Sequence, residues 1–203
     1  LTMHHIISDG WSFALLCQKL GTFYTGIVAG AAVTLPDLPI QYAEFSQKER
    51  EAISGATFQE HQAFWRKQFQ GNVATLQLPS DSADGIAPAH RGVREPFALS
   101  PELSKALVEL SQREKATLFM TLLAGFEAVL HQYSQQQDMV VCTPVSGRNR
   151  SDSRQLIGYF NNILPLRCDL RNDPTLLDLV RRTRQVALDS YKYQGFPFLS
   201  LVD

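Results

Sequence analysis

Cysteine, surplus positive charge and long apolar runs are all scarce in this sequence of 203 residues. The three cysteines, Cys17, Cys142 and Cys168, lie far apart and form no Cys-x-x-Cys pair, which disfavours a disulfide scaffold or a zinc site. The 19 Lys and Arg are balanced by 20 Asp and Glu, so the basic footprint of a nucleic-acid-binding protein is missing. No stretch is apolar enough to span a bilayer. We therefore expect a cytoplasmic protein whose partners are neither nucleic acid nor membrane.

The composition otherwise fits a well-packed globular protein. Hydrophobic residues make up 44% and charged residues 19% of the chain, which allows a sizeable core and excludes global disorder. The length suits one large domain or two small lobes. The chain opens on Leu1, and polar motif residues follow within four positions. We expect an internal piece of a longer protein, cut inside a strand at its start and inside a helical region at its end.

Hydrophobic periodicity predicts helices that alternate with short strands. Helices are expected over residues 11–28, 40–53, 58–69, 117–133 and 175–191, and from Pro101 onward with Ser100 as the N-cap. Strands are expected over residues 1–5, 93–99, 139–143 and 160–170. Pro165 requires a bulge or a sheet edge in the last of these, and residues 146–154 form a basic loop expected to be exposed. This alternation predicts a layered α/β or α+β fold.

A segment rich in Pro, Ser, Asp, Gly and Ala divides the chain. It covers residues 80–89 and is the best candidate for a linker. We expect residues 1–79 to be the end of an amino-terminal lobe that carries an active-site loop. Residues 90–203 are then the beginning and middle of a carboxy-terminal lobe.

One short loop near the amino end concentrates chemically active residues. His4 and His5 precede Asp9 and Gly10, with a predicted strand before the loop and a helix after it. Because neighbouring side chains on a strand point to opposite faces, one histidine should be functional and the other structural, and a shared metal site is disfavoured. Asp9 is expected to cap the helix or to form a buried carboxylate that an arginine braces.

The pattern His4-His5-x-x-x-Asp9-Gly10 resembles the active-site motif of nonribosomal peptide synthetase condensation domains, and Trp11-Ser12 is similar to the form found in peptide-bond-forming members. Related acyltransferases of the chloramphenicol acetyltransferase type share the core motif. Five later segments resemble condensation-domain motifs in family order: residues 38–45, 117–124, 143–150, 157–167 and 193–198. The sequence departs from these motifs at Glu44, Lys48, Asn161, Gly195 and Leu199.

The resemblance implies a chloramphenicol acetyltransferase-like, two-layer sandwich of two lobes, both truncated here. It implies an acyltransferase that joins an upstream carrier-bound acyl or peptidyl thioester to the amine of a downstream carrier-bound aminoacyl group. The partners would be the upstream and downstream carrier domains and an adenylation domain of the same assembly line. The domain itself would bind no cofactor or metal, since its substrates ride on 4'-phosphopantetheine.

The resemblance also distributes roles among the residues. His5 would be catalytic, as a general base or by orienting the amine, because an imidazole can accept a proton near neutral pH. His4 would pack inside the lobe, and Asp9 would brace the loop with Arg148, Arg150 or an arginine outside the chain. Gly10 would stand at the tunnel and favour a developing oxyanion through its N–H. The substrate tunnel would also be lined by Trp11, Ser12 and Asn162, and for Asn162 a turn or sheet-end hydrogen bond is an equal alternative.

Three alternatives stay open. An epimerization domain of the same family usually carries a different residue pair after the aspartate. An ester-forming acyltransferase would use an alcohol acceptor in place of the amine. A non-catalytic relative would only recruit partner enzymes.

Overall fold

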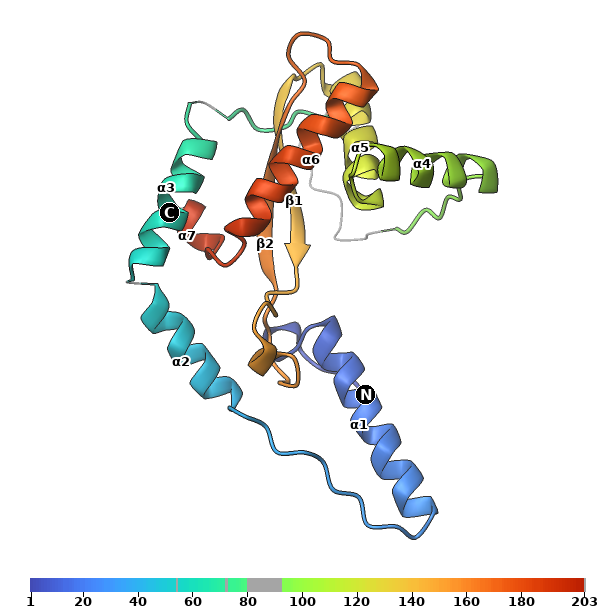
Figure 1. The fold of residues 1–203 in the computed structure, drawn as a ribbon, viewed down its shortest axis with the longest axis vertical. Coiled ribbons are helices and arrows are strands. Elements are labelled where there is room, and N and C mark those ends of the chain that lie inside the picture. Colours follow the sequence, from blue (N-terminus) through green and yellow to red (C-terminus); the bar gives the residue numbers. More distant parts are fainter. Residues whose placement is uncertain (54, 72, 80–92, 203) are drawn as a thin grey trace, which may run out of the picture. The chain divides into compact units, whose positions relative to one another are not determined.

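The computed structural model describes residues 1–53, 55–71, 73–79 and 93–202 of the chain. It is a mixture of helices and strands, as predicted (Figure 1). The first half holds the 3-10 helix η1 (His5–Ile7) and helices α1 (Gly10–Val28), α2 (Tyr42–Ala52) and α3 (Ala56–Gln68). The second half holds α4 (Pro101–Arg113), α5 (Leu118–Ser134), β1 (Asp138–Val145), η2 (Ser151–Ser153), β2 (Asn162–Asp169), α6 (Leu176–Lys192) and α7 (Leu199–Val202). The predicted linker, residues 80–89, lies outside the described residues, and the predicted division into lobes stays a prediction.

The predicted helices are confirmed, and their caps explain where they begin. Asp9 accepts a hydrogen bond from the Ser12 amide at the start of α1, and Ser100 accepts one from the Leu103 amide at the start of α4. Thr117 caps α5 in the same way. These side chains satisfy amide groups that the first helical turn leaves without a partner.

Two predicted strands are absent from the described residues. Residues 1–4 have no regular structure and run into η1, and residues 93–99 also lack regular structure. Val93 and Phe97 are almost fully exposed. An apolar run becomes a strand only where another strand supplies backbone hydrogen bonds, and a sequence pattern alone does not show that partner.

The described sheet contains two strands, β1 and β2. They run antiparallel, since the Leu170 amide just after β2 donates to the Gln137 carbonyl just before β1, at 2.7 Å. Each strand is therefore an edge strand, which is where Pro165 was expected.

The chain folds into two compact units that do not follow chain order. Unit 1 comprises Leu1–Gln68, Cys142–Leu164 and Tyr193–Asp203, and unit 2 comprises Phe69–Val141 and Pro165–Lys192. The boundary between the units thus falls inside both strands.

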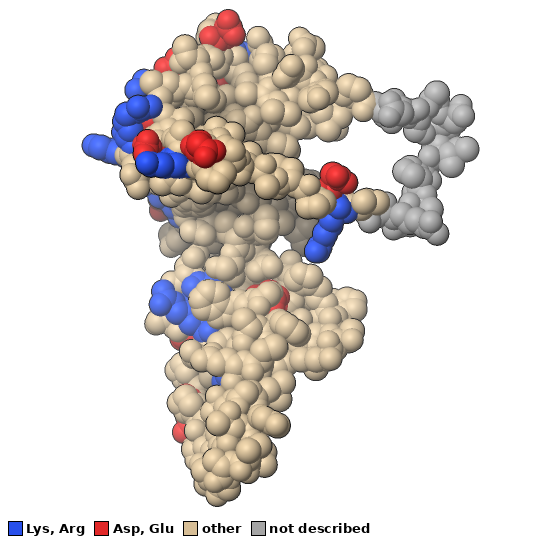
Figure 2. Space-filling view, turned by 90° about the vertical axis from the view of Figure 1, so that its right-hand side faces the viewer, with Lys and Arg blue, Asp and Glu red and all other residues tan. Residues whose placement is uncertain are grey.

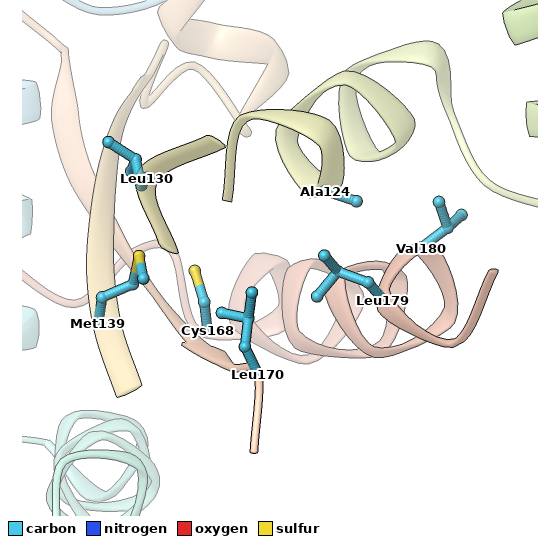
Figure 3. Close-up of a cluster of buried hydrophobic side chains, with 7 residues drawn as sticks. All are labelled: Ala124, Leu130, Met139, Cys168, Leu170, Leu179 and Val180. Atoms are coloured by element: carbon cyan, nitrogen blue, oxygen red, sulfur yellow. The ribbon is translucent and has the colours of Figure 1, made fainter. Parts of the chain in front are cut away.

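Each unit has its own apolar core. In unit 2, side chains from α5, β1, β2 and α6 meet between the helices and the sheet (Figure 3). This core consists of Ala124, Leu130, Met139, Cys168, Leu170, Leu179 and Val180. In unit 1, a smaller cluster joins Phe45 of α2 to Leu156 and Phe160 of the segment between the strands.

Helix α5 is buried on one side only. Met120, Leu123, Ala124 and Leu130 are buried, whereas apolar side chains on another stripe stay 41–64% exposed. That stripe consists of Phe119, Leu122, Phe126, Val129 and Tyr133.

Figure 2 shows that charged side chains occupy a small part of the face in view. None of the described helices is long and apolar enough to cross a membrane.

Candidate active site

The loop between η1 and α1 is held by a buried ion pair within unit 1. Arg148 donates from Nη2 to Oδ1 and Oδ2 of Asp9, at 3.1 and 3.2 Å. Both side chains are 1% exposed. Arg148 is thus the partner among the alternatives left open by the sequence, while Arg150 pairs with Asp152.

The Asp9 carboxylate accepts further hydrogen bonds from backbone amides. The Ser12 amide donates to Oδ1 at 2.7 Å, and the Phe160 amide donates to Oδ2 at 3.2 Å. Burial raises the pKa of the Asp9 carboxyl, but hydrogen bonds from Ser12 and Arg148 and the positive charge of Arg148 together lower the pKa below its ordinary value. Asp9 is therefore a fixed anion that joins the start of α1 to the segment before β2.

Arg148 is buried, which corrects the prediction that residues 146–154 form an exposed basic loop. Its Nη1 donates to the carbonyls of Ser153 and Leu156, at 2.6 and 2.9 Å. Its guanidinium lies 3.9 Å from the centre of the Phe160 ring. The family resemblance named Arg148 as one candidate partner of Asp9, 139 residues earlier, but the sequence did not show that the arginine would be buried.

Ser12 belongs to the same buried network. It is fully buried, and its hydroxyl donates to the Gly158 carbonyl at 2.7 Å while accepting from the Gly158 amide and from Arg148. The sequence predicted Ser12 on a tunnel wall, whereas the structure places it inside the packing because the first turn of α1 faces Gly158. Trp11 is 49% exposed, and its Nε1 donates to the Arg154 carbonyl at 2.9 Å.

Two residues that the sequence did not single out complete this packing. The ring of Tyr42 lies where a Cβ on Gly158 would be, so only glycine fits there. The Tyr42 hydroxyl donates to the Tyr159 carbonyl at 2.8 Å. Both residues fall within predicted family motifs, which was the available signal.

His5 lies beside an open hollow of about 440 Å³. Its Nδ1 is 2.7 Å from the Ser8 carbonyl oxygen, and its ring meets the Tyr159 ring edge-on at 5.5 Å between centres. Gly10 and Asp9 line the same hollow, together with Phe13 of α1. The hydrogen bond at Nδ1 and the contact with the Tyr159 ring fix the orientation of the imidazole.

His4 is exposed in the described residues, and its packing inside a complete lobe stays a prediction. Its Nδ1 accepts a hydrogen bond from the Ile6 amide at 3.1 Å and so caps η1. The prediction assumed a strand with alternating faces, but the chain turns into a 3-10 helix at His5. The two histidines are nevertheless separated, because His5 and not His4 lines the hollow.

Asn162, at the start of β2, is occupied by hydrogen bonds to a turn. Its Nδ2 donates to the carbonyls of Gln194 and Phe196, and its Oδ1 accepts from the Phe198 amide. Of the two alternatives for this residue, the sheet-end hydrogen bond is therefore observed. Asn162 also lines a cavity within unit 1.

The family model described as "Condensation domain" matches residues 1–203. The chain belongs to the condensation domain family. One of the linear gramicidin synthase proteins of Brevibacillus parabrevis is 43% identical over 201 residues, which cover 99% of this chain and 4% of that protein. This condensation-domain chain therefore spans a small part of the curated relatives that it matches.

Solved structures carry the same fold. The SgcC5 protein of Streptomyces globisporus is 30% identical, with a TM-score of 0.79 over 98% of this chain and 44% of that one. The X-domain from teicoplanin biosynthesis, solved in a complex with OxyB, is 24% identical, with a TM-score of 0.88 over 98% of this chain and 45% of that one, and shows the fold alone. The predicted fold class of this condensation-domain chain is thus confirmed.

Proposed function

We propose that this chain contributes the catalytic loop of a condensation domain that forms an amide bond between two carrier-bound substrates. The observation that carries the proposal is the position of His5, which lines an open hollow with its Nδ1 already engaged. Membership of the condensation domain family supports the same reaction class.

The contact with Ser8 selects one form of the imidazole ring. A carbonyl oxygen can only accept, so the proton of the neutral ring sits on Nδ1 and is donated to Ser8. Nε2 is then left with its lone pair free to accept a proton. In the proposed reaction, Nε2 takes the proton from the attacking amine or orients that amine by accepting its N–H.

The rest of the loop holds this geometry. The Asp9–Arg148 pair fixes the start of α1, and Gly10, the first residue of α1, lines the same hollow as His5. The amide groups at a helix start favour negative charge. The Gly10 amide is therefore proposed to stabilise the oxyanion that forms at the thioester carbonyl.

The proposed substrates are an acyl or peptidyl thioester and an aminoacyl thioester, each on the 4'-phosphopantetheine arm of a carrier domain. Relatives such as the linear gramicidin synthase and phosphinothricin tripeptide synthetase PhsB of Streptomyces viridochromogenes support carrier and adenylation domains as partners. We also propose that the protein is cytoplasmic, because its three cysteines are free thiols, which suits a reducing compartment.

Replacement of His5 tests the proposal. In an intact condensation domain containing this chain, we expect His5→Ala to lower amide formation by about 10²–10⁴-fold in a carrier-to-carrier transfer assay. The melting temperature should stay close to that of the wild type, because His5 is exposed.

His131→Ala is a matched control. The Nδ1 of His131 also lies against a backbone carbonyl, that of Gln136 at 2.8 Å, but on α5 in unit 2. This control should keep full transfer activity. Unchanged product with His5→Ala would refute the catalytic assignment and favour a non-catalytic, partner-recruiting role.

An ester-forming transferase is the second candidate. SgcC5, at 30% identity, was crystallised with a naphthyl-ethanediol, and an acceptor with a hydroxyl group would give an ester in place of an amide. Competing amine and alcohol acceptors on the same carrier separate the two reactions. We expect the amide to predominate, and a predominant ester would favour the second candidate.

A further inference from the structure

A cavity of about 600 Å³ lies within unit 1, beside the candidate active site. It is open to solvent on one side and is lined by α2, α3, the segment between the strands and the turn that follows α6. Its lining combines aromatic rings, such as those of Tyr42 and Phe45, with polar side chains from Thr57, Asn161 and Asn162. Tyr159 also lines this cavity, and its ring meets that of His5 edge-on. Tyr159 thus connects the cavity lining to the imidazole.

The turn Gln194–Phe198 forms one side of this cavity, through Gln194, Gly195 and Pro197. Helix α3 contacts the approach to this turn with a series of rings. His61 and Phe64 contact the ring of Tyr193, and Phe58 stacks on the ring of Phe196 at 4.7 Å between centres. Trp65 also donates to the Tyr193 carbonyl at 3.2 Å.

Asn162 holds the turn from β2. Its Nδ2 donates to the Gln194 carbonyl at 2.9 Å and to the Phe196 carbonyl at 2.7 Å. Its Oδ1 accepts from the Phe198 amide at 3.2 Å. A single side chain thus joins three backbone groups spread over five residues of the turn.

We propose that Asn162 is a positioning residue, which sets the turn Gln194–Phe198 as the wall of a substrate cavity next to His5. The cavity would take the acyl or aminoacyl part of a carrier-bound substrate, and this inference rests on the proposed amide-forming function. Asn162 acts here through the turn and touches no reacting atom. Its loss should weaken substrate binding more than the chemical step.

Only an amide supplies what the three backbone groups require. Two carbonyls need donors and one N–H needs an acceptor, and the two ends of an Asn side chain provide both. An aspartate has the same shape, but when ionised it only accepts, and it would place negative charge against two carbonyl oxygens. When protonated, it regains one donor. The two carbonyl oxygens disfavour the charged form and so raise the pKa of an aspartate at this position, and Asn162→Asp should therefore convert the turn into a pH-dependent element.

The test compares Asn162→Asp with the wild type in an intact condensation domain containing this chain, between pH 5.5 and pH 8.5. We expect kcat/KM of the variant, relative to the wild type, to fall by about tenfold as the pH rises over this range. The fall should appear as a higher KM for at least one carrier-bound substrate, with kcat kept within about twofold. Hydrogen exchange of residues 194–198, relative to the same residues of the wild type at each pH, should accelerate over this range, because the carboxylate repels the Gln194 and Phe196 carbonyls that Asn162 Nδ2 holds in the wild type.

Asn161→Asp is the matched control, because it puts the same carboxylate in the lining of the same cavity, one residue away. The other charged or titratable side chains around the cavity are Tyr42 and Glu49 of α2, His61 of α3, and Arg150 and Tyr159 of the segment between the strands. These groups are present in both variants, so comparison of the two removes their contribution. Asn161→Asp should leave exchange of the turn unchanged.

The outcomes separate this inference from the proposed function. A loss confined to kcat, or equal pH profiles for the two variants, would overturn the positioning role. Hydrogen exchange of residues 194–198 is measured without substrate. It therefore tests the role of Asn162 even if the wild type forms no amide. Absence of amide formation by the wild type would count against the proposed function alone.

Discussion

Asp9 and Arg148 form an ion pair that is closed to water. Removal of either charge therefore has a large cost in the free energy of folding. Each is 1% exposed, and backbone groups supply further hydrogen bonds to both side chains. Removal of one partner of a buried pair leaves the other charge desolvated, at a cost of about 3–5 kcal/mol. The pair therefore matters to stability chiefly because the loss of either partner destabilises the folded state.

Asp9→Ala should lower the melting temperature of the intact domain by several degrees, because Arg148 is left buried without its counter-charge.

A low pH should also destabilise the wild type. Hydrogen bonds and Arg148 lower the pKa of Asp9 in the folded state, so its contribution is present above the unfolded value of about 3.9 and is lost as the pH falls through the folded pKa. Thermal unfolding measured from pH 7 to pH 2 checks both effects.

Asp152→Ala is the control for this experiment. Asp152 also pairs with an arginine of the same segment, but Arg150 is about half exposed. Solvent screens such a pair, so its loss should change the melting temperature little. Equal effects of the two substitutions would contradict the buried-pair interpretation.

The sequence was informative about residue type at the site but not about its partners. The motif pointed to His5 and Asp9, and Asp9 does cap α1. Whether Arg148 or Arg150 would reach Asp9 depends on how the segment between the strands folds back. Gly147 helps to decide this, because it adopts φ +62° with its α-carbon against the Phe160 carbonyl. No local pattern encodes that approach.

At the scale of elements, the contact between α5 and α6 encloses a carboxyl group. Glu127 of α5 is 1% exposed, and the Thr183 hydroxyl of α6 donates to its Oε2 at 2.6 Å. Burial raises the pKa of Glu127, against the opposing effect of hydrogen bonds from Cys168 and Thr183. The neutral carboxyl is thus the form that this helix pair favours.

Glu127→Gln should stabilise the domain at neutral and alkaline pH, with a gain on the order of 1 kcal/mol, because glutamine keeps an acceptor for Thr183 and carries no charge. The sign follows from the raised pKa. The stability that the neutral carboxyl contributes is full below the unfolded value of about 4.3, and it is lost as the pH rises through the folded pKa. Melting temperatures at pH 5 and pH 8.5 check this, and the gain should be larger at pH 8.5.

Glu109→Gln on α4 supplies the comparison. Glu109 is 65% exposed and lies near Lys105, so its neutralisation should have little effect at either pH. A destabilised Glu127→Gln variant at pH 8.5 would mean that the carboxylate, and not the acid, is the favoured form.

Helices were predictable because their signals are local. Periodicity, together with the expected caps Asp9 and Ser100, fixed their starts to within a few residues. The predicted strand over residues 93–99 failed for the opposite reason, since strand formation depends on a partner far away in the sequence. Helix α5 is apolar all round but is buried on one side only, because uniform apolarity does not show which side is covered.

For the whole molecule, the division into two units leads to a distinct expectation for stability. Leu179 lies in the core of unit 2 and Phe45 in that of unit 1. Leu179→Ala should cost about 2–5 kcal/mol and accelerate hydrogen exchange mainly in α5 and α6. Phe45→Ala should accelerate hydrogen exchange mainly in α2 and in the segment between the strands.

Mass spectrometry of exchanged peptides from the intact domain measures both effects. If each substitution accelerates exchange equally in both units, the two units unfold together and the expectation is wrong. Peptides that cover β1 and β2 are the most informative, because the unit boundary crosses both strands.

The separation of 139 residues between Asp9 and Arg148 also has a consequence for synthesis on the ribosome. The amino-terminal histidine loop emerges first, but its brace is translated later by on the order of ten seconds, at about 5–20 residues per second. During that interval the carboxylate of Asp9 cannot pair with Arg148, and we expect water to solvate it instead. We therefore expect the proposed catalytic loop to reach its final geometry only after Arg148 has been made and closes this long-range contact.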